Sequence, residues 1–349
     1  MTQNNKNTVF SDVRSLQEMG EFGLIDRIQR LFNGNTDSQG IGIGDDCAVI
    51  PIDNDYSMLV TTDMLIEDRH FRRDWISAKD LGYKSLAVNL SDISAMGGKP
   101  EHAFLSIGLP DDISPGWLED FFLQTHTACE QYGVRLSGGD TTKSPRPIVI
   151  NYTVLGRICK KHIHLRSDAV PGDRIALLGN PGDSGAGFRL LKEQVPVNDN
   201  RHLRLIDAHN RPPLFVDEAQ FLAQYSGVHA LIDLSDGLRP DAGHIAERSN
   251  VIMRIELDTL PLSPEFTETC REFSWDMYNL ALTAGEDYGL LFTLNPEQAD
   301  GLARDFESRF GYRFSIIGDV QEGKADVVFK LDGRVKKIQT HGFDHFRSP

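Results

Sequence analysis

Two adjacent carboxylates, Asp45 and Asp46, stand immediately before the apolar run Cys-Ala-Val-Ile that ends at Ile50. That run is typical of a strand that enters a hydrophobic core. Burying a carboxylate without a partner is costly, so a fold that accepts this stretch must give the buried acid something to bind. Because successive strand residues point to opposite faces, only one of the two acids, which we take to be Asp46, can face a shared site.

The same local pattern, an aspartate beside small or hydroxyl residues at the end of an apolar element, recurs along the chain. The other aspartates in this setting are Asp63, Asp92, Asp140, Asp233 and Asp236. A single aspartate of this kind is usually a helix cap or a turn residue. Six that follow one pattern favour a common site, and the spacing of three between Asp233 and Asp236 lets both face one way if the backbone turns there.

Carboxylates gathered in one pocket repel one another, and in a dry pocket they do not all stay ionised. Hard divalent cations resolve this conflict, since Mg²⁺ binds a few carboxylates together with waters and substrate phosphates. The sequence therefore predicts a magnesium site that includes Asp46 and, through the metal, a polyphosphate ligand.

Apolar runs of strand length alternate with helical patterns, which is typical of α/β folds. The 349 residues are enough for two domains with separate cores. We expect an N-terminal extension over residues 1–19, an N-terminal domain over 20–158 and a C-terminal α/β domain over 159–349. The charged stretch 166–173, with its proline and glycine, is typical of a domain junction.

The expected elements follow from apolar periodicity and from cap and turn residues. In the first half we expect strands over 56–64, 102–110, 134–140 and 146–158, and helices over 20–32, 77–98 and 114–132. In the second half we expect strands over 174–179, 229–234, 289–294 and 315–320, a hairpin over 326–337, and helices over 184–193, 214–225 and 239–248.

Composition and motif searches exclude several classes of function. The formal net charge of −15 argues against nucleic acid and anionic membrane surfaces, which need basic partners. The four cysteines form no CxxC pair, so a zinc ribbon or thioredoxin site is not expected and a reduced compartment is. The polar start predicts no signal peptide, and no apolar run reaches the ~20 residues of a membrane span. We therefore expect a cytoplasmic protein.

Four catalytic or nucleotide-binding motifs are also excluded. The stretch GDSGAG at 182–187 is similar to the nucleophile loop of trypsin-like proteases, but it opens a predicted helix and lacks a β-barrel context. The glycines at 40, 42 and 44 lack the GxGxxG spacing of dinucleotide-binding folds. The chain contains neither a GxxxxGK[ST] nor an HExxH motif.

The stretches that carry the aspartates resemble, in the same order, the motifs of the thiamine-monophosphate kinase family, part of the aminoimidazole ribonucleotide synthetase superfamily. They are GIGDDCAVI, TTDMLIEDRHF, KSLAVNLSDISAMGGKP, SGGDTT, RSDAVPGD, PGDSGAG, ALIDLSDGL, ALTAGEDYGLLFT and HGFDHF. The resemblance implies an α/β (α+β) fold of the two-domain aminoimidazole ribonucleotide synthetase-like type. In that fold the mixed sheet of the N-terminal domain forms a barrel across a homodimer.

The resemblance also implies transfer of the ATP γ-phosphoryl group to thiamine monophosphate, giving thiamine diphosphate and ADP. By this resemblance several Mg²⁺ ions would be held by Asp46, Thr61, Thr62, Asp63, Asp92, Asp140, Asp233 and Asp236. ATP would contact Gly139, Asp140, Arg166 and Ser235, and thiamine monophosphate would contact His70, Glu286 and Phe343. Since the acceptor is a phosphate whose second pKa is near ~6, we expect neither a general base nor a phosphoenzyme.

Alternatives stay open for three of these residues and for the function. His70 fits an ordinary surface histidine, Arg166 a salt-bridged linker residue, and Glu286 the ion-pair partner of a neighbour. The alternative functions are another ATP-using enzyme of the superfamily, above all aminoimidazole ribonucleotide synthetase, and a non-enzymatic nucleotide or divalent-cation sensor. The chain departs from the usual family pattern, close to the expected substrate contacts, at Asp68, Arg69, Ala284 and Gly289.

Overall fold

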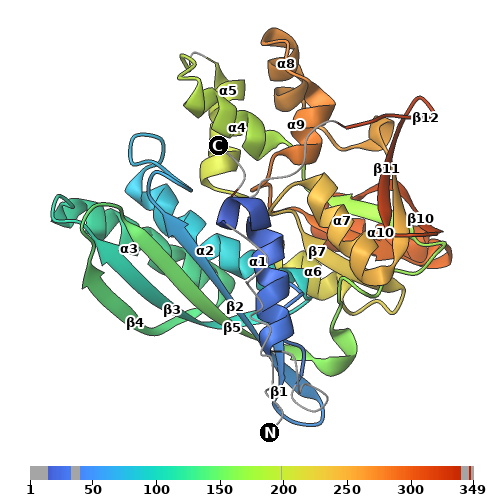
Figure 1. Ribbon diagram of the computed structural model, residues 1–349, viewed down its shortest axis with the longest axis horizontal. Helices are drawn as coiled ribbons and strands as arrows, with labels where there is room; N and C mark the ends of the chain where they lie inside the picture. The colour runs from blue at the N-terminus through green and yellow to red at the C-terminus, as the bar shows by residue number, and fades with distance from the viewer. Residues whose placement is uncertain (1–14, 33–39, 198, 339–345, 347–349) are drawn as a thin grey trace, which may run out of the picture.

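The computed structural model describes residues 15–32, 40–197, 199–338 and 346. Within them the strands form two mixed sheets, one in each half of the chain (Figure 1). The first sheet has the order β1-β2-β5-β3-β4, in which β3 and β4 run parallel and the other neighbours antiparallel. Its strands are β1 (Ala48–Pro51), β2 (Tyr56–Ile66), β3 (Lys99–Leu109), β4 (Arg135–Lys143) and β5 (Val149–Cys159).

The second sheet has the order β12-β11-β8-β10-β6-β9-β7, with β8 and β11 parallel and the other neighbours antiparallel. Its strands are β6 (Arg174–Leu178), β7 (Val228–Asp233), β8 (Val251–Glu256), β9 (Leu290–Leu294), β10 (Ser315–Glu322), β11 (Asp326–Leu331) and β12 (Arg334–Val335). The two mixed sheets with helices on them confirm the predicted α/β (α+β) class.

The helices of the first half are α1 (Leu16–Phe32), α2 (Ala78–Ala95) and α3 (Pro115–Tyr132). Those of the second half are α4 (Asp183–Lys192), α5 (Asn200–Asn210), α6 (Val216–Leu222), α7 (Leu238–Ser249), α8 (Pro264–Glu272), α9 (Met277–Thr283) and α10 (Pro296–Phe310). Two short 3₁₀ turns are η1 (Lys160–His162) and η2 (Leu257–Thr259). None of the helices in these described stretches is both long and apolar enough to span a membrane.

Helix α2 is the element that joins the two halves. It begins at a Ser77 cap, whose hydroxyl accepts the Asp80 amide, and every residue over 81–91 is buried. The helix packs on β2 and β5 of its own sheet and contacts β7 and α6 of the second half. A helix that is buried all round belongs in a core, so the polar side chains of α2 are held at the junction of the two domains.

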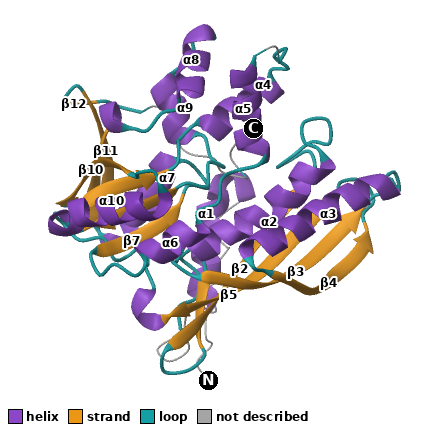
Figure 2. Cartoon of the chain, turned by 180° about the vertical axis from the view of Figure 1, so that it is seen from behind, coloured by secondary structure: helices purple, strands orange, loops and turns teal. Residues whose placement is uncertain are grey.

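Helix α3 has the ends that the sequence predicts. The Ser114 hydroxyl accepts the Trp117 amide, Pro115 occupies the first turn, and Gly133 closes the helix with φ 66°. Helices α2 and α3 lie together on one face of the first sheet (Figure 2). The opposite face carries exposed side chains, among them Met64 and Phe104.

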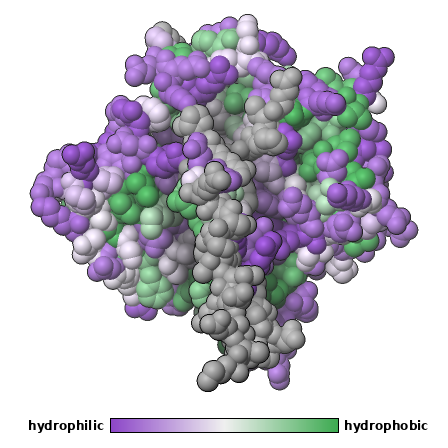
Figure 3. Space-filling view, viewed as in Figure 1, coloured by the Kyte–Doolittle hydropathy of each residue, from purple (hydrophilic) through white to green (hydrophobic). Residues whose placement is uncertain are grey.

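The first sheet does not close into a barrel within one chain, so the barrel that the resemblance implies requires a second copy. In the face shown in Figure 3 the surface is mostly hydrophilic, and its apolar parts form separate patches rather than one continuous area. The homodimer that the resemblance implies stays a prediction.

Several elements differ from the sequence-based expectation. A short helical segment that starts at Leu16 precedes the predicted helix in α1, and the two segments meet at Gly20, whose φ of 72° and ψ of 173° are not helical. Strand β8 and helices α5, α8, α9 and α10 were not predicted. For α10 the sequence did contain a start signal, since Asn295 caps the helix and Pro296 follows it.

Candidate active site

Three of the predicted aspartates meet at the junction of the two domains. Asp46 precedes β1, Asp92 lies on α2, and Asp233 ends β7. Each offers a carboxylate oxygen, and these three oxygens lie within 4.8 Å of one another. Asp46 precedes and Asp233 ends a strand, and Asp92 lies in the last turn of α2, so packing of the two domains brings the acids together.

Each of these carboxylates has one protein partner. Asp92 Oδ2 accepts the Thr61 hydroxyl at 2.5 Å, and Asp233 Oδ2 accepts the Ser91 hydroxyl at 2.5 Å. Arg166 Nη2 donates to Asp46 Oδ1 at 2.6 Å. Serine and threonine hydroxyls held in this way fix the orientation of a carboxylate without neutralising its charge.

Two carboxylate oxygens of the cluster are buried and receive no hydrogen bond from the described residues: Asp46 Oδ2 and Asp233 Oδ1. A buried acceptor without a partner is costly, and in native proteins it calls for an explanation such as a bound ion. Carboxylate and hydroxyl oxygens are the hard donors that Mg²⁺ prefers. The residues present therefore fit a divalent cation.

The electrostatics of the cluster lead to the same conclusion. Burial, reinforced by the charge of Asp46, raises the pKa of Asp233 to about 8. Burial and the neighbouring carboxylates, Asp63 first, raise the pKa of Asp92 well above its ordinary value. Burial raises the pKa of Asp63 to about 6, and its backbone amide is held by Asn89 of α2 at 2.9 Å. Without a cation, the protein holds these acids partly protonated.

Arg166 is partly buried and is ion-paired with acids of this cluster. Its guanidinium also lies 3.9 Å from Asp45 Oδ1, and its backbone oxygen accepts the Ser249 hydroxyl at 2.8 Å. Burial and the charge of Asp46 raise the pKa of Asp45 to about 7, against the opposing effect of Arg166. These ion pairs are also what a salt-bridged residue between the two domains would make, so the contact of Arg166 with ATP stays a prediction.

Asp236 lies in a second group of ligand-type side chains, with Asp241 and His244 of α7. Their ligand atoms lie within 4.8 Å of one another, and Asp241 also accepts the Gly237 amide at 3.0 Å. Burial lowers the pKa of His244 to about 4, so the ring is neutral. The sequence reasoning missed Asp241 and His244; their spacing of three on a predicted helix was the available signal.

Thr62 and Asp140, two of the predicted metal ligands, lie away from the acidic cluster in this chain. In the sheet, Asp63 is paired with Tyr152, Tyr152 with Leu105, and Leu105 with Gly139. Three strand spacings separate Asp63 from Gly139, a distance of about 14 Å. Thr62 precedes Asp63 and Asp140 follows Gly139, and both are exposed. Because neighbouring strand residues point to opposite faces, Thr62 and Asp140 lie on the open face of the sheet.

The loop between α9 and β9 carries the predicted substrate residue Glu286 and lies next to the acidic cluster. The Glu286 amide donates to the Ser235 carbonyl at 2.7 Å, and the Tyr288 amide donates to the Leu234 carbonyl at 2.8 Å. A Cβ on Gly285 would lie 2.3 Å from the Ser235 carbonyl oxygen, so only glycine permits this approach. Glu286 thus sits directly beside the segment that carries Asp233 and Asp236.

His70 is oriented by the backbone rather than placed loosely on the surface. Its Nδ1 accepts the Ile66 amide at 2.9 Å, so the ring is neutral and Nε2 carries the hydrogen. Glu286 has two neighbours: Lys84 Nζ lies 3.3 Å from its Oε2 and His209 Nδ1 lies 3.4 Å from the same atom. Phe343 lies outside the described residues.

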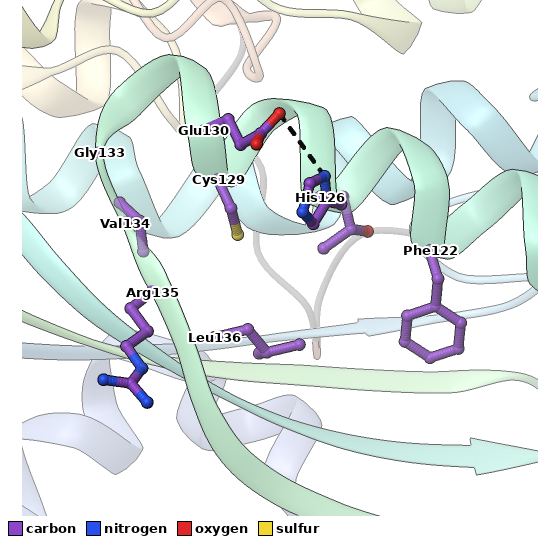
Figure 4. A pocket seen from close by; sticks show the side chains of 9 residues that line it. Phe122, His126, Cys129, Glu130, Gly133, Val134, Arg135 and Leu136 are labelled. Atoms are coloured by element: carbon purple, nitrogen blue, oxygen red, sulfur yellow. Dashed lines mark ion pairs between the residues drawn. The ribbon is translucent and has the colours of Figure 1, made fainter.

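A hollow of about 580 Å³ lies away from this cluster, between α3 and the start of β4 (Figure 4). Cys129, His126 and Glu130 line it from α3, and Arg135 and Leu136 from β4. It contains none of the predicted site residues. A smaller pocket of about 110 Å³ lies beside Ser184 and Asp287, next to the loop that carries Glu286.

Comparison with known proteins gives the family. The family model for the AIR synthase related protein N-terminal domain matches residues 44–158, and that for the C-terminal domain matches residues 170–330. The thiamine-monophosphate kinase of Escherichia coli K12 is 37% identical over 335 residues, which cover 95% of this chain and 99% of that protein. The chain belongs to the thiamine-monophosphate kinase family.

Solved structures agree with membership of the thiamine-monophosphate kinase family. "AaThiL complexed with AMPPCP and TMP" has a TM-score of 0.82 and 34% identity, covering 96% of this chain and 100% of that one. The thiamine-monophosphate kinase of Aquifex aeolicus is 36% identical over 331 residues, 95% of this chain and 99% of that protein. The hydrogenase maturation protein HypE in complex with ATP, at 20% identity and a TM-score of 0.68, shares the fold alone.

Proposed function

We propose that this protein phosphorylates thiamine monophosphate with ATP to give thiamine diphosphate and ADP. The observation that carries the proposal is the buried carboxylate cluster with two unpaired oxygens, in a chain 34% identical to a protein whose structure holds AMPPCP and TMP. The reaction belongs in the cytoplasm, where its co-substrate ATP is produced and used.

In this proposal Asp46, Asp63, Asp92 and Asp233 hold several Mg²⁺ ions, and Asp236 holds a further one. The ions supply charge neutralisation where two anionic phosphates must approach each other. Thr61 and Ser91 keep the carboxylates oriented. Because the acceptor arrives as a phosphate dianion, the side chains position and neutralise rather than remove a proton.

Arg166 and Ser235 contact ATP, and His70, Glu286 and Phe343 contact thiamine monophosphate. A homodimer completes the site. The open face of the first sheet, with its exposed Met64 and Phe104, is covered by a second copy to form the barrel. The proposed roles of Thr62, Gly139 and Asp140 belong to this dimer, because within one protomer Thr62 and Asp140 face away from the cluster.

The proposed reaction is tested by coupled measurement of ADP release, with thiamine diphosphate identified chromatographically. Thiamine monophosphate with ATP and Mg²⁺ gives both products, and free thiamine gives neither. ATP binding without either product favours the sensor alternative. Turnover with the substrate of aminoimidazole ribonucleotide synthetase, and none with thiamine monophosphate, favours that enzyme instead.

Replacing His70 by alanine raises the KM for thiamine monophosphate by about tenfold or more, because a neutral Nε2–H is lost that can donate to a phosphate oxygen. The KM for ATP stays within about twofold. Steady-state kinetics with each substrate varied in turn measure both effects. His126→Ala, at an exposed histidine of α3, is the matched control. A defect confined to ATP contradicts the substrate role.

A further inference from the structure

Lys84 is a buried lysine in the middle of α2, at the junction of the two domains. Its side chain is 1% exposed. A buried ammonium group is costly unless it is paired, and burial indeed lowers the pKa of Lys84, against the opposing charge of Glu286. Its Nζ lies 3.3 Å from Glu286 Oε2, a residue 202 positions later in the chain.

Glu286 is held from two directions. His209 of α5 approaches the same oxygen, with Nδ1 at 3.4 Å, and Ser184 Oγ lies 3.1 Å from that nitrogen. Burial, with the charge of Lys84, lowers the pKa of His209 to about 3, so the imidazole is neutral. Of these two neighbours, Lys84 is therefore the one that brings a positive charge to Glu286.

The backbone beneath Glu286 is fixed as well. Glu286 has a φ of 64°, and its amide bonds the Ser235 carbonyl. The next residue, Asp287, accepts the amides of Gly182 and Ser184 at 2.7 and 3.0 Å. Contacts of its main chain and of its side chain thus fix the position of the Glu286 carboxylate. The side chain is 29% exposed, so a ligand can reach it.

We propose that Lys84 is a positioning residue that holds the Glu286 carboxylate in place, aimed at the heterocyclic part of thiamine monophosphate, without touching the substrate itself. This inference rests on the proposed function. Thiamine monophosphate carries a cationic thiazolium ring and an aminopyrimidine with N–H donors, and both are complementary to a fixed carboxylate. The phosphate end is bound elsewhere, at the acidic cluster. Lys84 therefore affects recognition of the heterocycle and not ATP binding.

The test is a double-mutant cycle on the full-length protein with Lys84→Met, Glu286→Gln and the double variant. Lys84→Met raises the KM for thiamine monophosphate by at least about tenfold and leaves the KM for ATP within about twofold. In the Glu286→Gln background the same substitution changes the KM for thiamine monophosphate by less than about twofold, because Lys84 acts through Glu286. Lys79→Met, at an exposed lysine of the same helix, is the control.

Additive effects of the two substitutions overturn the inference, as does an unchanged KM in Lys84→Met when the wild-type protein is active. A wild-type protein that forms no thiamine diphosphate overturns the proposed function, and the inference with it. If Lys84→Met does not fold, the double variant is compared with Glu286→Gln. Equal KM values support the inference, and a further tenfold rise contradicts it.

Discussion

Replacing Asp92 by asparagine abolishes turnover and leaves the protein folded. The charges of Asp63, Asp233 and Asp46 all act on the Asp92 carboxylate. Loss of this carboxylate removes a proposed metal ligand from the site where the phosphates bind. We expect kcat to fall by at least about 10³-fold, since a metal supplies several kcal/mol of transition-state stabilisation. ADP release under saturating ATP and thiamine monophosphate measures the loss, and Asp63→Asn has the same effect.

The fold is expected to survive because the substitution removes like-charge repulsion. In the presence of a chelator, Asp92→Asn melts at or above the temperature of the wild-type protein. Asp120→Asn, at an exposed acid of α3, is the matched control and retains activity. Normal turnover in Asp92→Asn, or its failure to fold, contradicts the role assigned to this residue.

The stability of the metal-free protein falls as the pH rises. The pKa values of Asp233, Asp45 and Asp63 are raised to about 8, about 7 and about 6, from an ordinary 3.8. Between about pH 5 and about pH 8 the folded state therefore holds protons that the unfolded state has lost. For each extra proton that the folded state holds, the free energy of unfolding falls by about 1.4 kcal/mol as the pH rises by one unit.

Excess Mg²⁺ with an ATP analogue reduces this dependence, because bound cations keep the proposed ligands Asp63 and Asp233 deprotonated in the folded state. Thermal unfolding measured across this pH range, with chelator or with Mg²⁺, gives both curves. Asp233→Asn has a smaller slope in chelator than the wild-type protein. Equal slopes in chelator and in Mg²⁺ contradict the idea that the metal resolves the repulsion within the cluster.

Local sequence rules predicted much of the first half of the fold. Ser77 and Ser114 cap their helices, and Gly133 ends α3, because these residues satisfy helix ends through contacts within a few positions. The convergence of Asp46, Asp92 and Asp233 was also predictable, since each acid borders a buried element. The same setting also predicted Asp140 in this site, so it did not by itself define which acids meet.

Features that depend on sheet order could not be derived from the sequence. The order β1-β2-β5-β3-β4 puts two strands between β2 and β4, which separates Asp63 from Asp140 although both follow the same local pattern. By contrast, the position of Thr62 on the face opposite Thr61 and Asp63 follows from strand periodicity alone. Strand periodicity therefore argues against a metal site that Thr62 shares with Thr61 and Asp63 within one chain.

Contacts between the two domains could not be predicted from the sequence, for a different reason. Lys84 and Glu286 are 202 residues apart, and Ser91 and Asp233 are 142 apart. A lysine inside an apolar helix pattern indicates a buried charge, but it does not indicate the partner. Only the packing of α2 against the second half defines that partner, and tertiary packing of this kind is not encoded in local patterns.

The central claim is that the carboxylates of Asp46, Asp92 and Asp233 are ligands of divalent cations. Crystals grown with Mn²⁺ and an ATP analogue test it directly through anomalous scattering. We expect anomalous peaks about 2.1 Å from oxygens of these three carboxylates, with the analogue's phosphates bound to the same ions. Phosphates bound without any peak beside these oxygens would contradict it.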